Sequence, residues 1–300
     1  MFNFKSDIQF INYFRLFNFV SLILILISVG FIFYKGLNFG VDFKGGTLIE
    51  LRVENAEIGI GDVRQSFIKM DLGDVNVKKF GKGNDYLIKF EQTDKNKENF
   101  IENIKTQLSK NLAGNFSFRR VENVGPKVSG ELLKSGLIAI VLSLSAMLIY
   151  IWIRFEWQFS LGAIIALIHD VIITIGFFSI LEFEINLSIV AAVLTIVGYS
   201  MNDTVVIFDR VRENLKKYSS KSINEISNLS INETLSRTII TSLTTLLALL
   251  SIFFFGGKIL HGFSFAMILG VIFGTYSSIF IANPILIKLK VSQKSLLKED

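Results

Sequence analysis

Six apolar runs dominate the sequence, and each approaches the length needed to cross a lipid bilayer. They lie at about residues 17–34, 135–153, 159–181, 185–208, 238–255 and 263–287. A transmembrane helix needs about 20 mostly apolar residues. The runs therefore predict an α-helical polytopic membrane protein with six transmembrane helices, although a length of 300 residues alone would suggest about two soluble domains.

The segment 37–134 has no run long enough to span a bilayer and predicts a small α+β domain between the first two spans. Strands are expected at 47–53, 75–80, 86–90 and 116–121, and helices at 62–70 and from Thr93 or Asp94 to 112. The order β-α-β-β-α-β predicts a ferredoxin-like domain. Residues 1–36 show no Ala-x-Ala-like cleavage site, so we interpret the first run as an uncleaved span.

Basic residues are distributed unevenly between the two sides of the predicted spans. Arg154, the segment 209–237 and the tail 288–300 put many Lys and Arg residues on the side of the N-terminus. The opposite short loops hold only Glu182, Glu184 and Lys258. Cytoplasmic loops are enriched in Lys and Arg, so both termini, a loop at 209–237 and the tail are expected in the cytoplasm. The domain at 37–134 would then be extracytoplasmic.

The fourth apolar run contains a carboxylate, Asp203, next to Asn202. A charged side chain at the centre of a transmembrane helix costs about 2.5–3.5 kcal/mol on insertion scales, and the usual reason to keep one is a proton or ion pathway. Tyr199 lies four residues before Asp203 on the same helix face. We therefore expect a proton-relay site around Asp203, although a hydrogen bond that only packs two helices together is the alternative.

Three further polar residues lie in or beside the predicted spans. His169 and Asp170 are near the middle of the third span, where they form either a structural polar pair or part of a proton relay. Arg237 begins the fifth span, either as a basic anchor at the membrane surface or as a counter-charge for Asp203. Gly270 and Gly274 form a Gly-x-x-x-Gly step in the last span, which favours close helix packing.

Several function classes are disfavoured by what the sequence lacks. It has no cysteine, and its other histidine, His261, is expected in a short outer loop, so we expect no metal site and no cofactor. No phosphate-binding Gly-x-x-x-x-Gly-Lys-Ser/Thr motif is present, which argues against ATP hydrolysis. The net charge of +5 is explained by the basic flanks of the spans, so no nucleic-acid partner is expected. The chain is not expected to be an enzyme.

Three motifs resemble a known family. They are GYSMNDTVVIFDRVREN at 198–214, VDFKGG at 41–46 and VGPKVS at 124–129. Together they resemble the SecF branch of the SecD/SecF family of protein-export membrane proteins, which is related to the proton-driven resistance-nodulation-division exporters. By this resemblance, Asp203 and Arg237 are the important intramembrane charges, and the domain at 37–134 is the small periplasmic one.

The resemblance implies an accessory subunit of the Sec translocase in the bacterial inner membrane. With SecD it would use the proton-motive force to promote late steps of protein export. The implied partners are SecD, the SecYEG channel, translocating polypeptides and membrane lipid, with YajC and YidC as further candidates. A proton-driven small-molecule exporter subunit and a non-catalytic membrane scaffold are the alternatives. The single small outer domain argues against the exporter.

Overall fold

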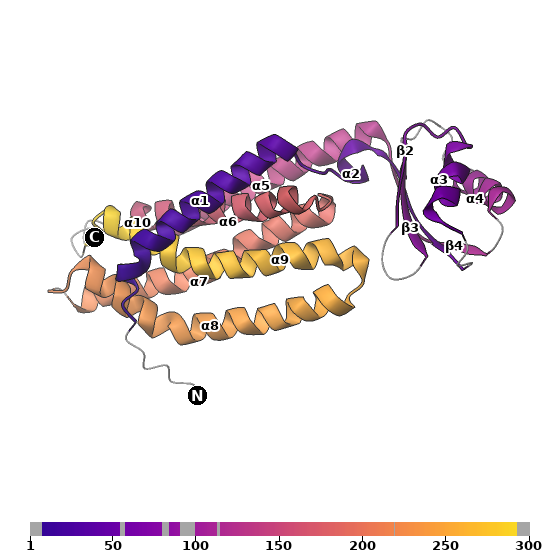
Figure 1. Cartoon of the computed structure of the whole chain (residues 1–300). Helices are drawn as coiled ribbons and strands as arrows, with labels where there is room; N and C mark the ends of the chain where they lie inside the picture. Colours follow the sequence, from indigo (N-terminus) through magenta and orange to yellow (C-terminus); the bar gives the residue numbers. More distant parts are fainter. Residues whose placement is uncertain are drawn as a thin grey trace. The chain divides into compact units, whose positions relative to one another are not determined.

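The computed structural model divides the chain into two compact units (Figure 1). A helical unit comprises Met1–Asn38 and Gly136–Asp300, and a sheet unit comprises Phe39–Ser135. The structure describes residues 8–54, 58–79, 84–90, 100–112, 115–218 and 220–292. Six helices in these ranges are long and apolar enough to cross a membrane, and one antiparallel sheet has four strands. The predicted fold class is therefore confirmed.

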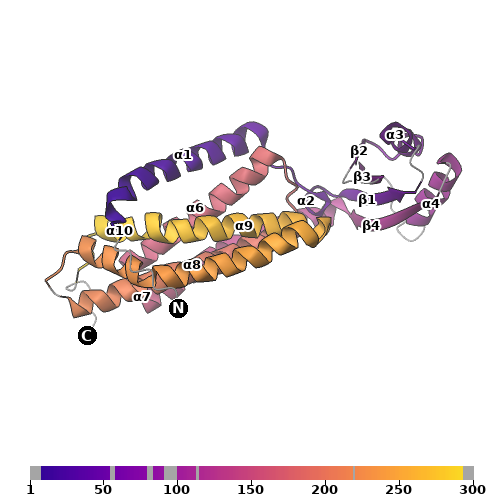
Figure 2. The same cartoon turned by 60° about the horizontal axis from the view of Figure 1, so that its bottom comes forward.

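The long helices form in the order that the apolar runs predict. They are α1 (Ile11–Lys35), α5 (Pro126–Arg154), α6 (Trp157–Leu181), α7 (Leu187–Lys217), α8 (Ile223–Phe255) and α9 (Lys258–Ser277). α9 packs against α6, α7 and α8, and it runs beside α8 in Figures 1 and 2. The predicted outer loop around His261 is wrong, because that residue belongs to α9 and its ring stacks on Phe253 at 3.9 Å between centroids.

The predicted loop at 209–237 is mostly helical in the described residues. α7 continues to Lys217, and α8 already begins after Ser222, whose hydroxyl and Glu225 form a capping box. Hydropathy ended the fourth span too early and began the fifth span too late, because charged residues interrupt the apolar pattern there. They do not interrupt the helices, since Arg210 of α7 pairs with Glu233 of α8 at 2.6 Å.

The last predicted span is interrupted rather than continuous. α9 passes into a π-helix, η1 (Ser278–Ala282), and then into α10 (Asn283–Lys288). Pro284 is the cause we assign, because proline has no N–H to donate to the preceding turn and its ring clashes with that turn. The Asn283 side chain donates to the carbonyl of Ser278 at 3.2 Å, which satisfies one backbone oxygen of the wider turn.

The sheet unit has the strand order β2-β3-β1-β4, all antiparallel. Its elements are α2 (Val41–Lys44), β1 (Gly46–Val53), α3 (Ile60–Ile68), β2 (Val75–Lys79), β3 (Asp85–Phe90), α4 (Phe100–Asn111) and β4 (Phe116–Val124). This is the predicted ferredoxin-like order. Thr93 and Asp94, the expected start of the second helix, lie outside the described residues. The short helix α2 ends at Gly45, whose φ of +78° favours glycine.

The core of the sheet unit follows from the alternation of its strands. Ile49, Leu51 and Val53 point to one face of β1 and are at most 4% exposed. Val63 and Phe67 of α3 and Leu108 of α4 cover that face. Figure 1 shows α3 and α4 on the same side of the sheet. The apolar faces of the two helices and of the strands thus pack together in a single cluster.

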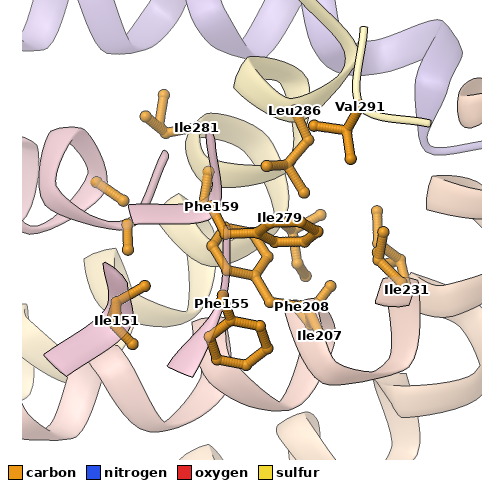
Figure 3. Close-up of a cluster of buried hydrophobic side chains, with 14 of the residues drawn as sticks. Ile151, Phe155, Phe159, Ile207, Phe208, Ile231, Ile279, Ile281, Leu286 and Val291 are labelled. Atoms are coloured by element: carbon orange, nitrogen blue, oxygen red, sulfur yellow. The ribbon is translucent and has the colours of Figure 1, made fainter. Parts of the chain in front are cut away.

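Aromatic side chains and small residues pack the helical unit together. Phe159 of α6 and Phe208 of α7 meet edge to face at 5.1 Å between ring centroids (Figure 3). Elsewhere the backbones approach closely. A Cβ on Gly270 of α9 would lie 2.3 Å from Cγ1 of Ile196, so only glycine fits against α7 there. The predicted close contact at the Gly-x-x-x-Gly step is confirmed.

Candidate functional site

Two carboxylates are almost completely buried between the helices of the helical unit. Asp170 of α6 is 0% exposed and Asp203 of α7 is 4% exposed. Both helices contain windows apolar enough for membrane spans, with only a few charged residues. Ionisable groups in such helices are costly unless they serve a purpose. These two residues are therefore the starting point for the site.

Asp203 has few hydrogen-bond donors. Its Oδ2 accepts from the hydroxyls of Ser242 on α8 at 3.4 Å and of Thr275 on α9 at 3.3 Å, both long distances. Those two hydroxyls also lie 2.6 Å from each other. Each hydroxyl carries one hydrogen. One hydrogen must bridge Ser242 and Thr275, so only one is left for Asp203.

The residues expected around Asp203 divide into those the structure brings near and those it does not. The half-buried Tyr199 donates its hydroxyl to the carbonyl of Thr241 on α8 at 3.3 Å, one turn from Asp203. Asn202 is exposed on the other side of α7, because adjacent helical residues point about 100° apart. The sequence pattern could not tell these two residues apart.

Arg237 does not form an ion pair with Asp203 in the described part of the chain. Its side chain lies on the exposed side of α8. Arg210 on α7 is the other candidate cation, and it is occupied by Glu213 at 2.5 Å and Glu233 at 2.6 Å. Arg237 on α8 has no ion pair among the described residues, so it is the candidate cation that is not already paired.

Asp170 is held much more firmly than Asp203. Its Oδ1 lies 2.9 Å from Nδ1 of His169, and its Oδ2 accepts from Ser200 of α7 at 2.7 Å and from Ser277 of α9 at 2.8 Å. The carboxylate thus joins three helices. His169 is 2% exposed and its ring stacks on that of Tyr276 at 6.0 Å between centroids.

Three residues of the site were missed by the sequence analysis: Ser242, Thr275 and Ser277. Each is a small hydroxyl residue inside an apolar helix, where such residues usually bond to their own backbone. The hydroxyl residues within the last two spans were the available signal. Among the ranges the structure describes, no group of three or more His, Cys, Asp or Glu side chains could hold a metal ion.

Comparison with protein families gives two matches to this chain. Residues 104–292 match the model described as protein export membrane protein SecD/SecF, C-terminal. Residues 30–57 match the SecD/SecF GG motif, which includes the glycines around α2. The two matches cover β1, most of α4, β4 and all the helices from α5 to α10.

Similar proteins have also been named in two Rickettsia species. Protein translocase subunit SecF of Rickettsia bellii is 49% identical over 283 residues, which is 94% of this chain and 93% of the relative. The subunit of the same name from Rickettsia prowazekii is 48% identical over 285 residues, 94% of this chain and 91% of the relative.

Two solved structures are similar as well. The translocon-associated membrane protein SecDF of Thermus thermophilus matches with a TM-score of 0.86 and 33% identity. SecDF in a super-membrane-facing form matches with a TM-score of 0.70 at the same identity. Each match covers 97% of this chain and only 40% of the SecDF chain, so this chain spans less than half of that longer protein.

Proposed function

The chain belongs to the SecD/SecF family of protein-export membrane proteins, and from that premise we propose that it is an accessory subunit of the Sec translocase. Together with SecD it uses the proton-motive force to promote late steps of protein export. The relatives named as SecF translocase subunits over nearly their full length support the translocase role. The role is that of a transport subunit rather than an enzyme.

Asp203 carries the proposal for proton use. It is buried between three helices and is held by two long hydrogen bonds that compete for the same hydrogens. Protonation of this carboxylate would remove a buried charge and disrupt few contacts. A proton crossing the membrane supplies about 2.3 kcal/mol per 100 mV. Arg237 would act as the counter-charge, with Tyr199 one turn from Asp203 on the same helix. Asn202, which is exposed, and the buried pair of His169 and Asp170 are not assigned to the proton path.

SecD is the proposed direct partner. This chain matches 40% of SecDF, and its named relatives are SecF subunits, which supports SecD as the source of the remaining part of a SecDF-like assembly. The two SecDF structures match this chain with different TM-scores at equal identity, which supports a machine that changes shape. SecYEG, YajC, YidC and the translocating polypeptide are proposed as further partners on the family likeness alone.

We also propose that the chain lies in the inner membrane with both termini in the cytoplasm. The excess of Lys and Arg in 209–237 and 288–300 supports this orientation. The segment 37–134 would then be periplasmic. Because the chain has no cysteine, single cysteines are specific probes. A cysteine at Leu181 should react with an impermeant thiol reagent from outside intact cells, and one at Lys217 should not. The reverse pattern would overturn the orientation.

The proton proposal is tested by proton-driven export into vesicles that carry the chain with its SecD partner. Asp203→Asn keeps the shape of the side chain but cannot exchange a proton. Export should fall to the rate seen without a proton gradient. Asp209→Asn is the matched control, because Asp209 is an exposed carboxylate on the same helix, paired with Arg154 at 3.0 Å. It should export like the parent chain.

The variants must be compared at equal abundance in the membrane. Arg237→Lys keeps the charge but not the planar guanidinium, so its defect should be milder than that of Arg237→Ala. If Asp203→Asn exports as fast as the parent under an imposed gradient, Asp203 is not the proton carrier. The scaffold role would then explain the chain better.

A further inference from the structure

We propose that Asp170 is a positioning residue that holds α7 and α9 in register around Asp203, rather than a carrier of the transported proton. The inference rests on the role proposed above for Asp203. Asp170 is fully buried and accepts hydroxyl hydrogens from Ser200 and Ser277, which belong to the two other helices. Its carboxylate is the one group that joins α6, α7 and α9 by side-chain hydrogen bonds in the described ranges.

The geometry argues against a proton relay between the two carboxylates. Asp203 bonds to Ser242 and Thr275, whereas Asp170 bonds to His169, Ser200 and Ser277. No side-chain hydrogen bond links these two sets among the residues that the structure describes. His169 does not extend the hydrogen-bonded chain either, because its Nε2 is buried without a hydrogen-bond partner in the described ranges. The side-chain hydrogen bonds of the described residues therefore form no continuous chain from Asp170 to Asp203.

The same contacts are well placed to fix helix register. Ser200 lies three residues before Asp203 on α7, which is about one turn. Ser277 lies two residues after Thr275 on α9. Both serines meet at one oxygen, Oδ2 of Asp170, at 2.7 Å and 2.8 Å. Holding these two points together fixes how far along α7 the hydroxyl of Thr275 reaches. It therefore determines whether Thr275 can donate to Asp203.

Close packing strengthens this arrangement. A Cβ on Gly274 of α9 would lie 2.9 Å from Cβ of Ser200, so the two helices touch at the level of the Asp170 hydrogen bond. Immediately after Ser277 the helix changes to the π-helical segment η1. A π-helical turn is a point where a helix can shift its register. The bond from Ser277 to Asp170 lies at the last regular turn before it.

His169 extends the arrangement to the first helix. Its ring stacks on Tyr276 of α9, and the hydroxyl of Tyr276 lies 2.7 Å from Oγ of Ser21 and from the carbonyl of Phe17 on α1. A pair that carried protons would need a donor or acceptor at the other ring nitrogen. A pair that orients helices needs only the contacts that are present.

The test compares Asp170→Asn with Asp170→Leu in the full chain with its SecD partner. Asparagine can still accept both serine hydroxyls at its amide oxygen, and its NH₂ can donate to Nδ1 of the other histidine tautomer. Leucine has the same branching at Cγ but a larger side chain, and it accepts no hydrogen bond. Asp170→Asn should therefore export within about twofold of the parent. Asp170→Leu should export about tenfold more slowly, the factor expected from losing one hydrogen bond to a charged group.

A second readout separates positioning from general loss of structure. The infrared carboxyl band that disappears in Asp203→Asn identifies the protonated form of Asp203. In Asp170→Leu the pH midpoint of this band should shift by about one unit, because the donor contact from Thr275 is altered. In Asp170→Asn the pH midpoint of the Asp203 band should equal that of the parent chain. Ser277→Ala, which removes one hydroxyl and no carboxylate, should shift the midpoint in the same direction and covers the case in which Asp170→Leu does not assemble.

The outcomes distinguish this inference from the proposed function. If Asp203→Asn stops proton-driven export and Asp170→Asn stops it as well, Asp170 carries the proton and the positioning role is wrong. If Ser277→Ala leaves both the export rate and the Asp203 midpoint unchanged, the positioning role is also wrong, while the proton role of Asp203 remains. If Asp203→Asn instead exports at the parent rate, the proposed proton role of Asp203 is wrong.

Discussion

The helical unit and the sheet unit differ in the side chains that they hide and expose. The helical unit hides Asp170 and Asp203 and exposes large apolar residues, such as Leu26 at 62% and Phe33 at 85%. The sheet unit hides Ile49, Val63 and Phe67 completely. The same chain therefore follows two rules, one suited to a hydrocarbon solvent and the other to water.

The difference shows which interactions can hold each unit together. In water, burial of apolar surface stabilises a core by about 25 cal/mol per Å². In lipid that contribution is absent between helices, and close packing and hydrogen bonds replace it. The contacts of Gly176 with Ser28 and of Gly270 with Ile196 belong to the second kind. Apolar truncations should therefore damage the sheet unit, and changes to small residues should damage the helical unit.

The largest expected effect is that of Phe67→Ala in the sheet unit. Phe67 is 0% exposed and its ring lies 6.1 Å from that of Phe90. Its truncation should cost about 3–5 kcal/mol of unfolding free energy. Thiol labelling of a cysteine at Thr47, a buried position in an otherwise cysteine-free chain, would report opening of the unit in denaturant.

The neighbouring Ile68→Ala is the control for that prediction. Ile68 is on the same helix but is 57% exposed, so its truncation should change the unfolding free energy by less than about 0.5 kcal/mol. Equal labelling rates in Phe67→Ala and Ile68→Ala would show that apolar burial does not hold this unit together, and the comparison would fail.

A smaller effect is expected from Gly176→Ala in the helical unit. A Cβ at Gly176 would lie 2.2 Å from Cβ of Ser28 and 2.7 Å from its Cα, so α1 has to move away from α6. Such overpacking costs about 1–3 kcal/mol. The fluorescence of the two tryptophans, Trp152 and Trp157, reports unfolding of this unit in detergent.

Gly30→Ala is the matched change on α1, where nothing lies within 4 Å of the new Cβ. Alanine is favoured over glycine in a helix by up to about 1 kcal/mol, so this variant should be as stable as the parent or slightly more so. A loss in Gly30→Ala equal to that in Gly176→Ala would mean that close packing is not the cause.

The smallest expected effect is that of Tyr86→Phe, which tests whether a buried polar contact matters in the sheet unit as well. The hydroxyl of Tyr86 donates to the carbonyl of Ile58 at 2.7 Å, and its loss should cost about 1 kcal/mol. Burial raises the pKa of Tyr86, and the charge of Asp62 raises it further.

The raised pKa also gives a direction in pH. Below about pH 10, the ordinary tyrosine value, Tyr86 is neutral in both the folded and unfolded chain. Above it, the unfolded chain loses the proton first, so the stability of the sheet unit should fall as the pH rises. The fall should be smaller in Tyr86→Phe when thiol labelling is compared across this range. An identical fall in both chains would assign it to other groups.

Much of the architecture could be predicted from the sequence because it depends on local periodicity. The lengths of the apolar runs predict the six spans, and partial alternation along 47–53 predicts the strand β1. The end of α7 and the start of α8 were predicted wrongly. Hydropathy identifies whether a helix is surrounded by lipid or by water. A helix itself ends only where its backbone hydrogen bonds stop, and charged residues such as Arg210 do not interrupt those bonds.

The candidate site divides in the same way. The sequence by itself determined that Asp203 is an anomaly, because a carboxylate in an apolar run is visible without any structure. Tertiary structure alone decided that Asp203 is buried while its neighbour Asn202 is exposed, and that Ser242 and Thr275 face it. Those two donors lie on α8 and α9, far along the chain from Asp203 on α7. Their contact with Asp203 depends on how closely α9 can approach α7, which its glycines allow. No pattern within one helix encodes that approach, because it is a property of two surfaces packed together.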